Sequence, residues 1–393
     1  MNPPLDGPAG DRPRAIPCQK TLFDLPDDVA YLRCAAMSPG LRAAQEAGAA
    51  GLAHKAHPWR LNAGHYFKDV EMARGLFAQL IGATADDIAV VPSASYGIAT
   101  AAANLPLAAG QSIVLLAEQF PSNVYAWREL AKANGGRIVT VARPCDDDWT
   151  AAVLEAIGGD TAIVTLGQCH WADGGLVDLA AVAGRARQVG AALALDVTQS
   201  AGVAPLSVAE LDPDFLVAVT YKWLLGPYSF GFLYVAPRHQ NGRPIEHNWV
   251  GRANAQDTNN ISDYTDAYQP GARRFDVGER GNFVSIPQAI AGLRQILDWG
   301  VDNIAHTIAP MTAEIGARAA DLGFRVPAPG RHIGHIVGLR MPDGLPADLN
   351  ERLSAAGVYI SVRGDSIRVA PHLYNDAGDI DRLFKELAAA GQS

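Results

Sequence analysis

The 393-residue sequence has few cysteines, no long apolar run and no excess of positive charge. Its four cysteines, Cys18, Cys34, Cys145 and Cys169, are widely spaced and never form a CxxC pair, so we expect neither a disulfide framework nor a metal site. No apolar run approaches the roughly 18 residues that a membrane-spanning helix needs, which predicts no membrane partner. The N-terminus is rich in proline and lacks a basic-then-apolar signal, so we expect a cytoplasmic protein.

The balance of charges also excludes a class of partner. The chain has 32 Lys and Arg against 41 Asp and Glu, a net charge of -9. A nucleic-acid footprint needs clustered excess positive charge, so we expect no nucleic acid as a partner. With 49% hydrophobic and 19% charged residues, the chain can instead bury a large core. At roughly 150 residues per domain, its length suggests two or three domains.

From about residue 88 the sequence alternates short apolar runs with longer amphipathic stretches, the pattern of a largely parallel sheet covered by helices. The near-continuous hydrophobicity of the runs fits strands that are buried on both faces. The predicted strands are residues 88–91, 112–117, 137–141, 162–166, 192–196, 215–219 and 231–235. The predicted helices between them lie near residues 97–104, 123–134, 149–158 and 178–189.

After about residue 284 the pattern changes to helices near 287–298, 301–322, 346–356 and 377–390, with short strands near 335–340 and 366–369. This pattern predicts a smaller α+β domain. We therefore expect a flexible tail (1–20), a large domain (41–284) and a small domain (21–40 with 285–393). The polar segment 240–283 is too long for an idle connection and predicts a functional loop or an interface excursion.

The chain contains no GxGxxG, GxxxxGK[ST] or HExxH motif, which removes the common signatures for dinucleotides, nucleoside triphosphates and zinc hydrolysis. An open parallel sheet still binds its ligand at the carboxyl ends of its strands. The polar residues that the predicted strands place there include Ser95, Asp196, Gln199, Thr220 and Lys222. One cofactor, pyridoxal 5'-phosphate, needs such a combination of an amine, a carboxylate and phosphate donors.

Each residue of this set is expected to have a distinct chemical role toward pyridoxal phosphate. Lys222 supplies the amine for a Schiff base, and its apolar neighbours are expected to lower its pKa. Asp196 faces the pyridine nitrogen and keeps it protonated. The turn at Ala94 and Ser95 opens a helix whose free N–H groups suit a dianion, with hydroxyls from Ser95 and Thr220. Phe120 is placed to stack on the pyridine ring.

Two segments carry a family resemblance, Asp196-Val-Thr-Gln199-Ser-Ala-Gly202 and Thr220-Tyr-Lys222-Trp-Leu-Leu-Gly226-Pro227. They resemble the class V aminotransferase family of fold-type I enzymes, which includes cysteine desulfurases, kynureninase and isopenicillin N epimerase-like proteins. The resemblance implies an α/β fold, with a mostly parallel seven-stranded sheet in the large domain and a smaller α+β C-terminal domain. It implies Lys222 as the Schiff-base lysine, Asp196 as the pyridinium partner and Thr220 as a phosphate ligand. Gln199 then hydrogen-bonds the ring hydroxyl, and Tyr221 stands where many members have a phosphate-contacting histidine.

The resemblance extends to the substrate and to a second subunit. Arg368 corresponds to the arginine that grips the substrate carboxylate, a task that suits a planar guanidinium. The loop at Gly278 and Glu279 resembles one that reaches the neighbouring subunit's phosphate, so we expect a homodimer with Gly278 offering its N–H and Glu279 pointing away. His170 and Trp171 follow the fourth strand and are predicted to line the substrate pocket.

The reaction is less constrained than the cofactor. No cysteine follows Cys169, which disfavours desulfuration through a loop cysteine. We expect transamination of an L-amino acid, with a 2-oxo acid as acceptor, and β-elimination or kynureninase-like hydrolysis as alternatives. A serine hydrolase at Ser229 is a distant alternative, because this serine precedes a strand instead of a helix. A non-catalytic binding module is another, and the retained Lys222 and Asp196 argue against it.

Overall fold

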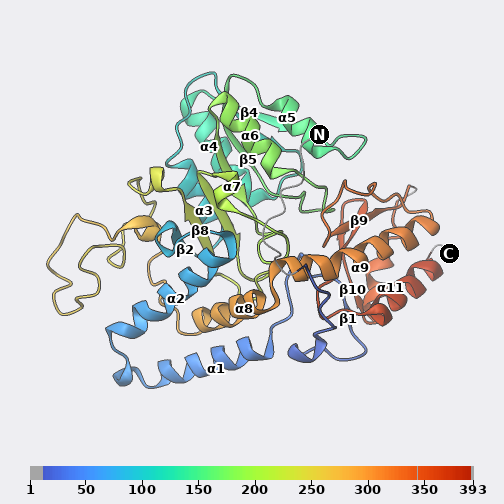
Figure 1. Cartoon of the computed structure of the whole chain (residues 1–393), viewed down its shortest axis with the longest axis horizontal. Coiled ribbons are helices and arrows are strands. Elements are labelled where there is room, and N and C mark those ends of the chain that lie inside the picture. Colours follow the sequence, from blue (N-terminus) through green and yellow to red (C-terminus); the bar gives the residue numbers. More distant parts are fainter. Residues whose placement is uncertain (1–11, 343, 391–393) are drawn as a thin grey trace.

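The computed structural model describes residues 12–342 and 344–390. In this part of the chain, the largest sheet has seven strands in the order β2-β8-β7-β6-β5-β3-β4 (Figure 1). The strands are β2 (Ile88–Val91), β3 (Ser112–Leu116), β4 (Arg137–Val141), β5 (Thr161–Leu166), β6 (Ala192–Asp196), β7 (Phe215–Val219) and β8 (Gly231–Val235). Strand β8 runs antiparallel to both of its neighbours, and the other strands are parallel. The predicted mostly parallel sheet is confirmed, with each strand within one residue of its predicted bounds.

Burial explains why these seven strands could be predicted from the sequence. Every residue of β2, β3, β7 and β8 is buried, because helices cover both faces of the sheet. The helices between the strands are α3 (Ala94–Ala102), α4 (Tyr125–Asn134), α5 (Trp149–Ala156), α6 (Leu179–Val189) and α7 (Val208–Leu211). Side chains of Ser93, Asp148 and Asp178 cap the first turns of α3, α5 and α6. These caps fix where each helix starts, just beyond the preceding strand or loop.

Two helices precede the sheet in the sequence and were not predicted: α1 (Arg42–Ala56) and α2 (Ala63–Ile81). Helix α8 (Ser285–Trp299) lies against both of them (Figure 1). The contact with α1 depends on glycine, because a Cβ at Gly51 would stand 1.8 Å from the backbone oxygen of Phe283. Small residues therefore carry the packing of α1, and they leave little apolar periodicity for a sequence pattern to show.

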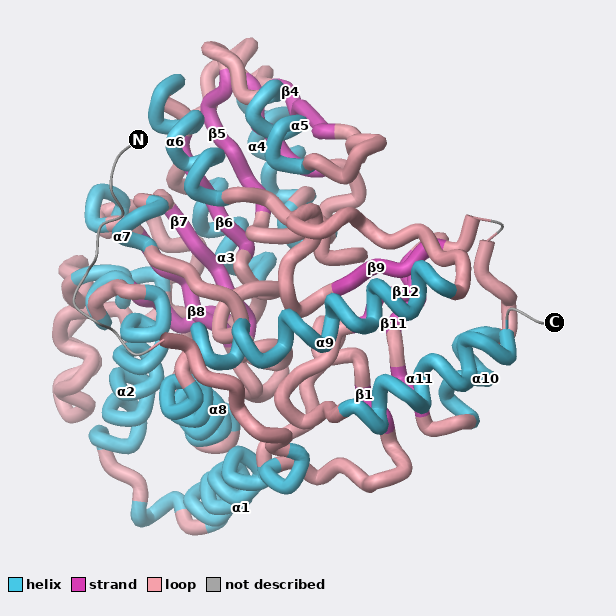
Figure 2. Tube along the Cα trace, turned by 45° about the vertical axis from the view of Figure 1, so that its right-hand side comes forward, coloured by secondary structure: helices cyan, strands magenta, loops and turns pink. Residues whose placement is uncertain are grey.

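The remaining elements form a second body with its own core (Figure 2). Its helices are α9 (Val301–Asp321), α10 (Leu349–Ala355) and α11 (Ala377–Ala390). Strands β11 (Ser361–Arg363), β12 (Ser366–Val369) and β9 (Val337–Arg340) form an antiparallel sheet, and β1 (Ala30–Tyr31) pairs in parallel with β10 (Val358–Tyr359). Elsewhere along the described chain, as well as in this body, short 3-10 helices span Lys20–Leu22, Pro58–Arg60, Ala85–Asp87, Pro121–Asn123, Pro237–His239 and Gly271–Phe275.

We propose the domain division read from the sequence, with residues 21–40 joining the C-terminal body. Its support is that Ala30 and Leu32 are fully buried in the core of that body. Helix α8, however, contributes Ile286 and Leu293 to the core around the large sheet, although it follows residue 284. Most of the predicted tail, residues 1–11, lies outside the described residues.

Within the described ranges, no helix is both long enough and apolar enough to cross a bilayer. The same ranges contain no group of three or more His, Cys, Asp or Glu side chains arranged to hold a metal ion.

Candidate active site

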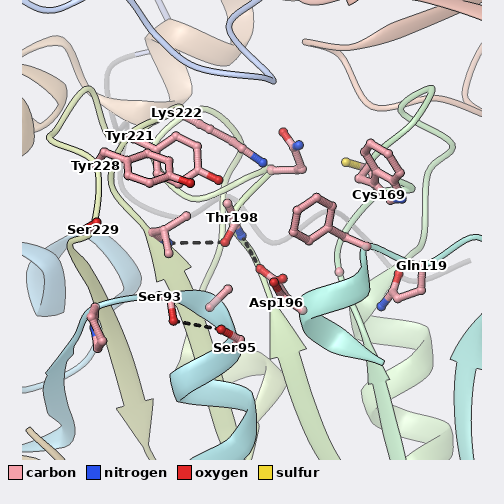
Figure 3. Close-up of a pocket in the computed structure, with 18 residues that line it drawn as sticks. Ser93, Ser95, Gln119, Cys169, Asp196, Thr198, Tyr221, Lys222, Tyr228 and Ser229 are labelled. Atoms are coloured by element: carbon pink, nitrogen blue, oxygen red, sulfur yellow. Dashed lines mark hydrogen bonds between the residues drawn. The ribbon is translucent and has the colours of Figure 1, made fainter. Parts of the chain in front are cut away.

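A cavity of about 280 Å³ opens at the carboxyl edge of the parallel strands (Figure 3). Segments that follow β2, β3, β5, β6 and β7 form its wall, together with the turn before β8. The lining residues are Pro92, Ser93, Ala94, Ser95, Gln119, Phe120, Ser122, Gly167, Cys169, Trp171, Asp196, Thr198, Gln199, Val219, Tyr221, Lys222, Tyr228 and Ser229. The topology thus brings together eight predicted site residues: Ala94, Ser95, Phe120, Trp171, Asp196, Gln199, Tyr221 and Lys222.

Lys222 is the one amine in this wall. It follows β7, and only 6% of it is exposed. Its Nζ lies 5.4 Å from the ring centre of Phe120 and 5.5 Å from that of Tyr221. Burial lowers the pKa of Lys222 to about 8, although the charge of Asp196 acts in the opposite direction. A neutral, nucleophilic amine is therefore accessible near physiological pH.

Asp196 ends β6 and faces the same cavity (Figure 3). Burial raises its pKa, while hydrogen bonds from Thr198 and the charge of Lys222 oppose that shift. One carboxylate oxygen accepts the backbone N–H of Thr198 at 3.1 Å. No cationic side chain among the described residues forms an ion pair with Asp196 within 4 Å. A carboxylate in this position suits a cationic N–H of a bound ligand.

The start of α3 forms another side of the cavity. The first N–H groups of a helix have no acceptor inside the helix, so those of Ala94 and Ser95 are available to an anion. Ser93 caps the helix by accepting the N–H of Tyr96 at 3.1 Å, and its hydroxyl lies 2.9 Å from that of Ser95. The helix end and the Ser95 hydroxyl fit a phosphate.

Gln199 is held by its neighbours at the cavity wall. Its Oε1 accepts the indole N–H of Trp223 at 3.0 Å, and its Nε2 donates to the backbone oxygen of Ala35 at 3.0 Å. The amide is therefore fixed in orientation, with one N–H remaining for a ligand.

The structure does not place Thr220 among the residues that line the cavity. Its side chain is fully buried outside the cavity wall, and its hydroxyl lies 2.7 Å from the backbone oxygen of Pro227 and 3.0 Å from that of Phe230. A hydroxyl has a single proton, which these two acceptors take. Thr220 thus closes the turn between β7 and β8 instead of facing a phosphate.

His170 is also not part of the cavity wall, in contrast to its neighbour Trp171. It is fully buried and stacks on Trp149 with ring centres 5.1 Å apart. Its Nε2 lies 3.1 Å from the backbone oxygen of Ala117, and its Nδ1 lies 3.4 Å from Asp173. These contacts hold the His170 ring behind the wall, so the structure does not bring it together with the predicted site residues that line the cavity.

Arg368 and Gly278 lie outside the cavity wall. Arg368 is 1% exposed and donates to the backbone oxygen of Trp171 at 2.6 Å, so it stands behind that tryptophan. The N–H of Gly278 donates to Glu246 at 3.0 Å, while Glu279 is exposed. In the single chain, the N–H of Gly278 is thus already occupied.

Sequence reasoning assigned no role to four polar lining residues, Gln119, Ser122, Thr198 and Tyr228, and weighed Ser229 only as a distant candidate nucleophile. Gln119 and Ser122 belong to a polar run after β3 from which only Phe120 was singled out. Ser229 has a φ of 60°, in the left-handed region that non-glycine residues rarely adopt. This backbone conformation sits two residues before β8, where no helix follows, so the geometry of a nucleophile elbow is missing.

The residues present fit pyridoxal phosphate. The cavity holds a desolvated lysine, a carboxylate without a cationic partner and a helix start, as the aldehyde, the ring nitrogen and the phosphate require. Phe120, whose ring faces Lys222, provides an aromatic surface between them. Each of these features is a property of the chain itself.

Comparisons with known proteins agree with this chemistry. The sequence model of the "Aminotransferase class-V" family matches residues 49–383. An uncharacterised aminotransferase of Bacillus subtilis, YcbU, is 31% identical over 328 residues, which cover 81% of this chain and 83% of the relative. A kynureninase of Yarrowia lipolytica is 26% identical over 361 residues, covering 82% of each chain.

A solved structure of C-DES, a variant with glycine covalently linked to its PLP cofactor, has a TM-score of 0.84 at 18% sequence identity and covers 94% of this chain and 98% of its own. At that identity the likeness shows the fold alone, a fold-type I architecture. The match of the family over most of the sequence goes further: this chain is an enzyme of the class-V aminotransferase family.

Proposed function

We propose that the protein is a pyridoxal-phosphate-dependent aminotransferase that acts on an L-amino acid through Lys222. The observation that carries the proposal is the pairing of a buried lysine, with its pKa lowered to about 8, and an unpaired Asp196 in one cavity. Pyridoxal phosphate supplies an aldehyde that condenses with an amine and a ring that withdraws electrons from the substrate's Cα.

The chain's own residues divide the remaining work. Lys222 would hold the aldehyde, and its lowered pKa is what a base for the substrate's Cα proton needs. Asp196 keeps a proton on the ring nitrogen through its negative charge. The α3 start and Ser95 would bind the phosphate, and Phe120 would supply an aromatic surface for the ring.

A second candidate is cleavage of the substrate side chain, by β-elimination or kynureninase-like hydrolysis. It is favoured by the 26% identity to kynureninases over most of the chain. Desulfuration through Cys169 is not proposed, because burial raises the pKa of this thiol to about 12 and keeps it protonated.

The test is a product assay with a panel of L-amino acids and pyruvate. Transamination yields alanine and a 2-oxo acid without ammonia, whereas elimination yields ammonia. Kynurenine hydrolysis yields alanine without any need for pyruvate. Lys222→Ala should abolish every product, and Lys385→Ala, which removes an exposed lysine on α11, should leave the rates unchanged. Ammonia as the main product, or full activity of Lys222→Ala, would contradict the proposal.

We also propose a homodimer and a cytoplasmic location. Support for the dimer is a cavity of about 510 Å³ whose lining includes the apolar side chains of Leu52, Tyr66, Trp249 and Phe283, of which Leu52 is 60% exposed. Support for the location is that all four cysteines are unpaired, as is usual in a reducing compartment.

A further inference from the structure

Three arginines gather directly behind the cavity wall. Arg33 Nε donates to the hydroxyl of Ser361 at 3.2 Å, and an Nη of Arg368 lies 3.5 Å from the same oxygen. Arg363 is two residues from Ser361, at the end of β11. Segments from the N-terminus and from the β11–β12 hairpin thus bring the guanidinium groups of Arg33 and Arg368 to one hydroxyl, and the charge of Arg363 acts on Arg368 from the same hairpin.

The group adjoins the substrate side of the cavity through Trp171. The Arg363 guanidinium carbon lies 5.6 Å from the centre of the Trp171 ring, and that of Arg368 lies 5.8 Å from it. Both positive charges also lower the pKa of Lys222, so both act on the amine across the cavity. The three arginines therefore belong to the electrostatics of this site.

The cluster has no acid to balance it. Among the described residues, no Asp or Glu forms an ion pair with Arg33, Arg363 or Arg368. The nearest acid in sequence, Asp365, lies 3.4 Å from Arg340 instead.

The cluster also has hydrogen-bond donors without an acceptor. The Nε atoms of Arg363 and Arg368 are buried and have no partner. Desolvation and the charges of its neighbouring arginines lower the pKa of Arg368 to about 9. Unpaired, buried and mutually repelling cations are costly, and a bound anion would relieve that cost.

One guanidinium is enough for one carboxylate, because two parallel N–H bonds satisfy both oxygens. The cluster therefore holds more guanidinium groups than the α-carboxylate of a substrate needs. We propose that the substrate is an amino acid with an acidic side chain, its second carboxylate being received by Arg363 with Arg33 in support. This inference rests on the proposed function and deepens it by naming the substrate class.

The burial of Arg368 and Arg363 indicates which substrate carboxylate each of them binds. Arg368 is buried and fixed by the backbone oxygen of Trp171, which suits the invariant α-carboxylate of any amino acid. Arg363 is half-buried at the end of β11, and among the described residues its Nη1 donates only to the neighbouring backbone oxygen of Val362 at 2.9 Å, so its guanidinium is less firmly fixed than that of Arg368. Arg363 is thus the specificity-determining residue of the pair.

The first test measures the preference for acid over amide in the cofactor-loaded enzyme. L-aspartate against L-asparagine, and L-glutamate against L-glutamine, differ in charge at nearly constant shape. In at least one pair, kcat/KM for the acid should exceed that for the amide by about a hundredfold or more. Arg363→Gln should lower this ratio at least about tenfold, mainly through KM, and Arg363→Lys should restore part of it.

A matched control is Arg187→Gln, which removes an exposed arginine at the end of α6, just before β6 begins and so at the opposite edge of the sheet. It should leave the ratio unchanged. An amide preferred over its acid, or a ratio that Arg363→Gln does not alter, would overturn the proposal.

The second test uses the protein without cofactor and measures binding alone. Succinate should raise Tm more than its monoamide does at equal concentration, since only succinate carries two carboxylates. Arg363→Gln should remove the difference, and Arg187→Gln should keep it. An equal effect of the two compounds on the parent protein would overturn the proposal.

The two tests separate this inference from the proposed function. If the protein forms no covalent attachment at Lys222 but the succinate effect depends on Arg363, the anion site stands and the cofactor assignment fails. If Lys222 is modified and neutral amino acids are the better substrates, the cofactor assignment stands and the acidic substrate class is wrong.

Discussion

The central residue of the site owes its reactivity to what surrounds it. Lys222 is enclosed by aromatic rings, and loss of water disfavours its charged form more than Asp196 favours it. At pH 7 an amine with a pKa near 8 is roughly 10% neutral, against well under 0.1% for an ordinary lysine. The buried lysine is therefore ready to react before any ligand binds.

This difference predicts a pH profile for Lys222. In the cofactor-free protein, reductive methylation of Lys222 should rise with pH through a midpoint near 8, because the neutral amine is the reactive form. Methylation of Lys385, an exposed lysine on α11, is followed as the reference. Mass spectrometry of peptides across pH 6 to about 11 measures both in one sample. Identical profiles for the two lysines would contradict the assigned burial effect.

Asp196 contributes charge and can be tested without changing shape. Asp196→Asn should lower kcat on the order of 10²–10³, the usual cost of losing one preorganised electrostatic group, while the phosphate contacts still retain the cofactor. Asp321→Asn, at the exposed end of α9, is the matched control. An Asp196→Asn enzyme with parental kcat would remove Asp196 from the proposed mechanism.

At the scale of elements, the contact between the two bodies contains buried histidines. His335, before β9, places its Nε2 2.6 Å from the backbone oxygen of Gln199 and packs edge-on against Trp223. His372, after β12, is fully buried and neither of its ring nitrogens has a partner. Burial lowers the pKa of His335 to about 4 and that of His372 to about 3. Both rings stay neutral in the folded protein at physiological pH.

These lowered pKa values predict loss of stability in acid. Below pH 6.5 the unfolded chain binds protons at these histidines and the folded chain does not, so the free energy of unfolding falls as pH drops from 6.5 towards 4. The loss from both groups is on the order of a few kcal/mol. His372→Phe should unfold with a smaller acid-dependent decrease in Tm than the parent.

The matched variant is His306→Phe on α9, where the histidine is exposed. It should keep the parental dependence of Tm on pH. A His372→Phe protein that loses as much Tm between pH 6.5 and 4 as the parent would refute the assigned role of His372.

The elements also show where sequence patterns succeed. All seven strands of the sheet were predicted, because strands buried on both faces are written as apolar runs such as Ile88–Val91 and Phe215–Val219. Helix α1 was not, because Gly48 and Gly51 pack by their lack of a side chain. A helix face that packs through glycine has no apolar side chains there, so a pattern of apolar residues cannot predict it.

For the site, the sequence predicted a side chain's place in the cavity where that side chain lies at or just after the end of a strand. Asp196 ends β6, Lys222 lies three residues after the end of β7, and both line the cavity. The contacts of several other side chains could not be predicted from the sequence. The Thr220 hydroxyl closes its own turn, His170 stacks on Trp149, and the arginine cluster assembles from residues more than 300 positions apart in the sequence, such as Arg33 and Arg363. Such outcomes depend on tertiary contacts.

At the scale of the molecule, the proposed dimer gives a prediction. The parent should have a mass of twice 41.5 kDa by light scattering. Leu52→Glu places a charge on an exposed apolar position of α1 and should raise the dimer dissociation constant at least about tenfold. Leu322→Glu changes a leucine of 40% exposure at the end of α9 and should leave the mass unchanged. A parent protein of 41.5 kDa at all concentrations would contradict the dimer.

The central claim concerns a covalent bond between the chain and pyridoxal phosphate, and one measurement tests it most directly. The protein is incubated with pyridoxal phosphate, reduced with borohydride, digested and mapped by mass spectrometry. The account predicts one dominant modified peptide, carrying the mass of the reduced cofactor on Lys222, and no such peptide from Lys222→Ala. Modification spread over exposed lysines such as Lys55 and Lys385, with Lys222 unmodified, would contradict it.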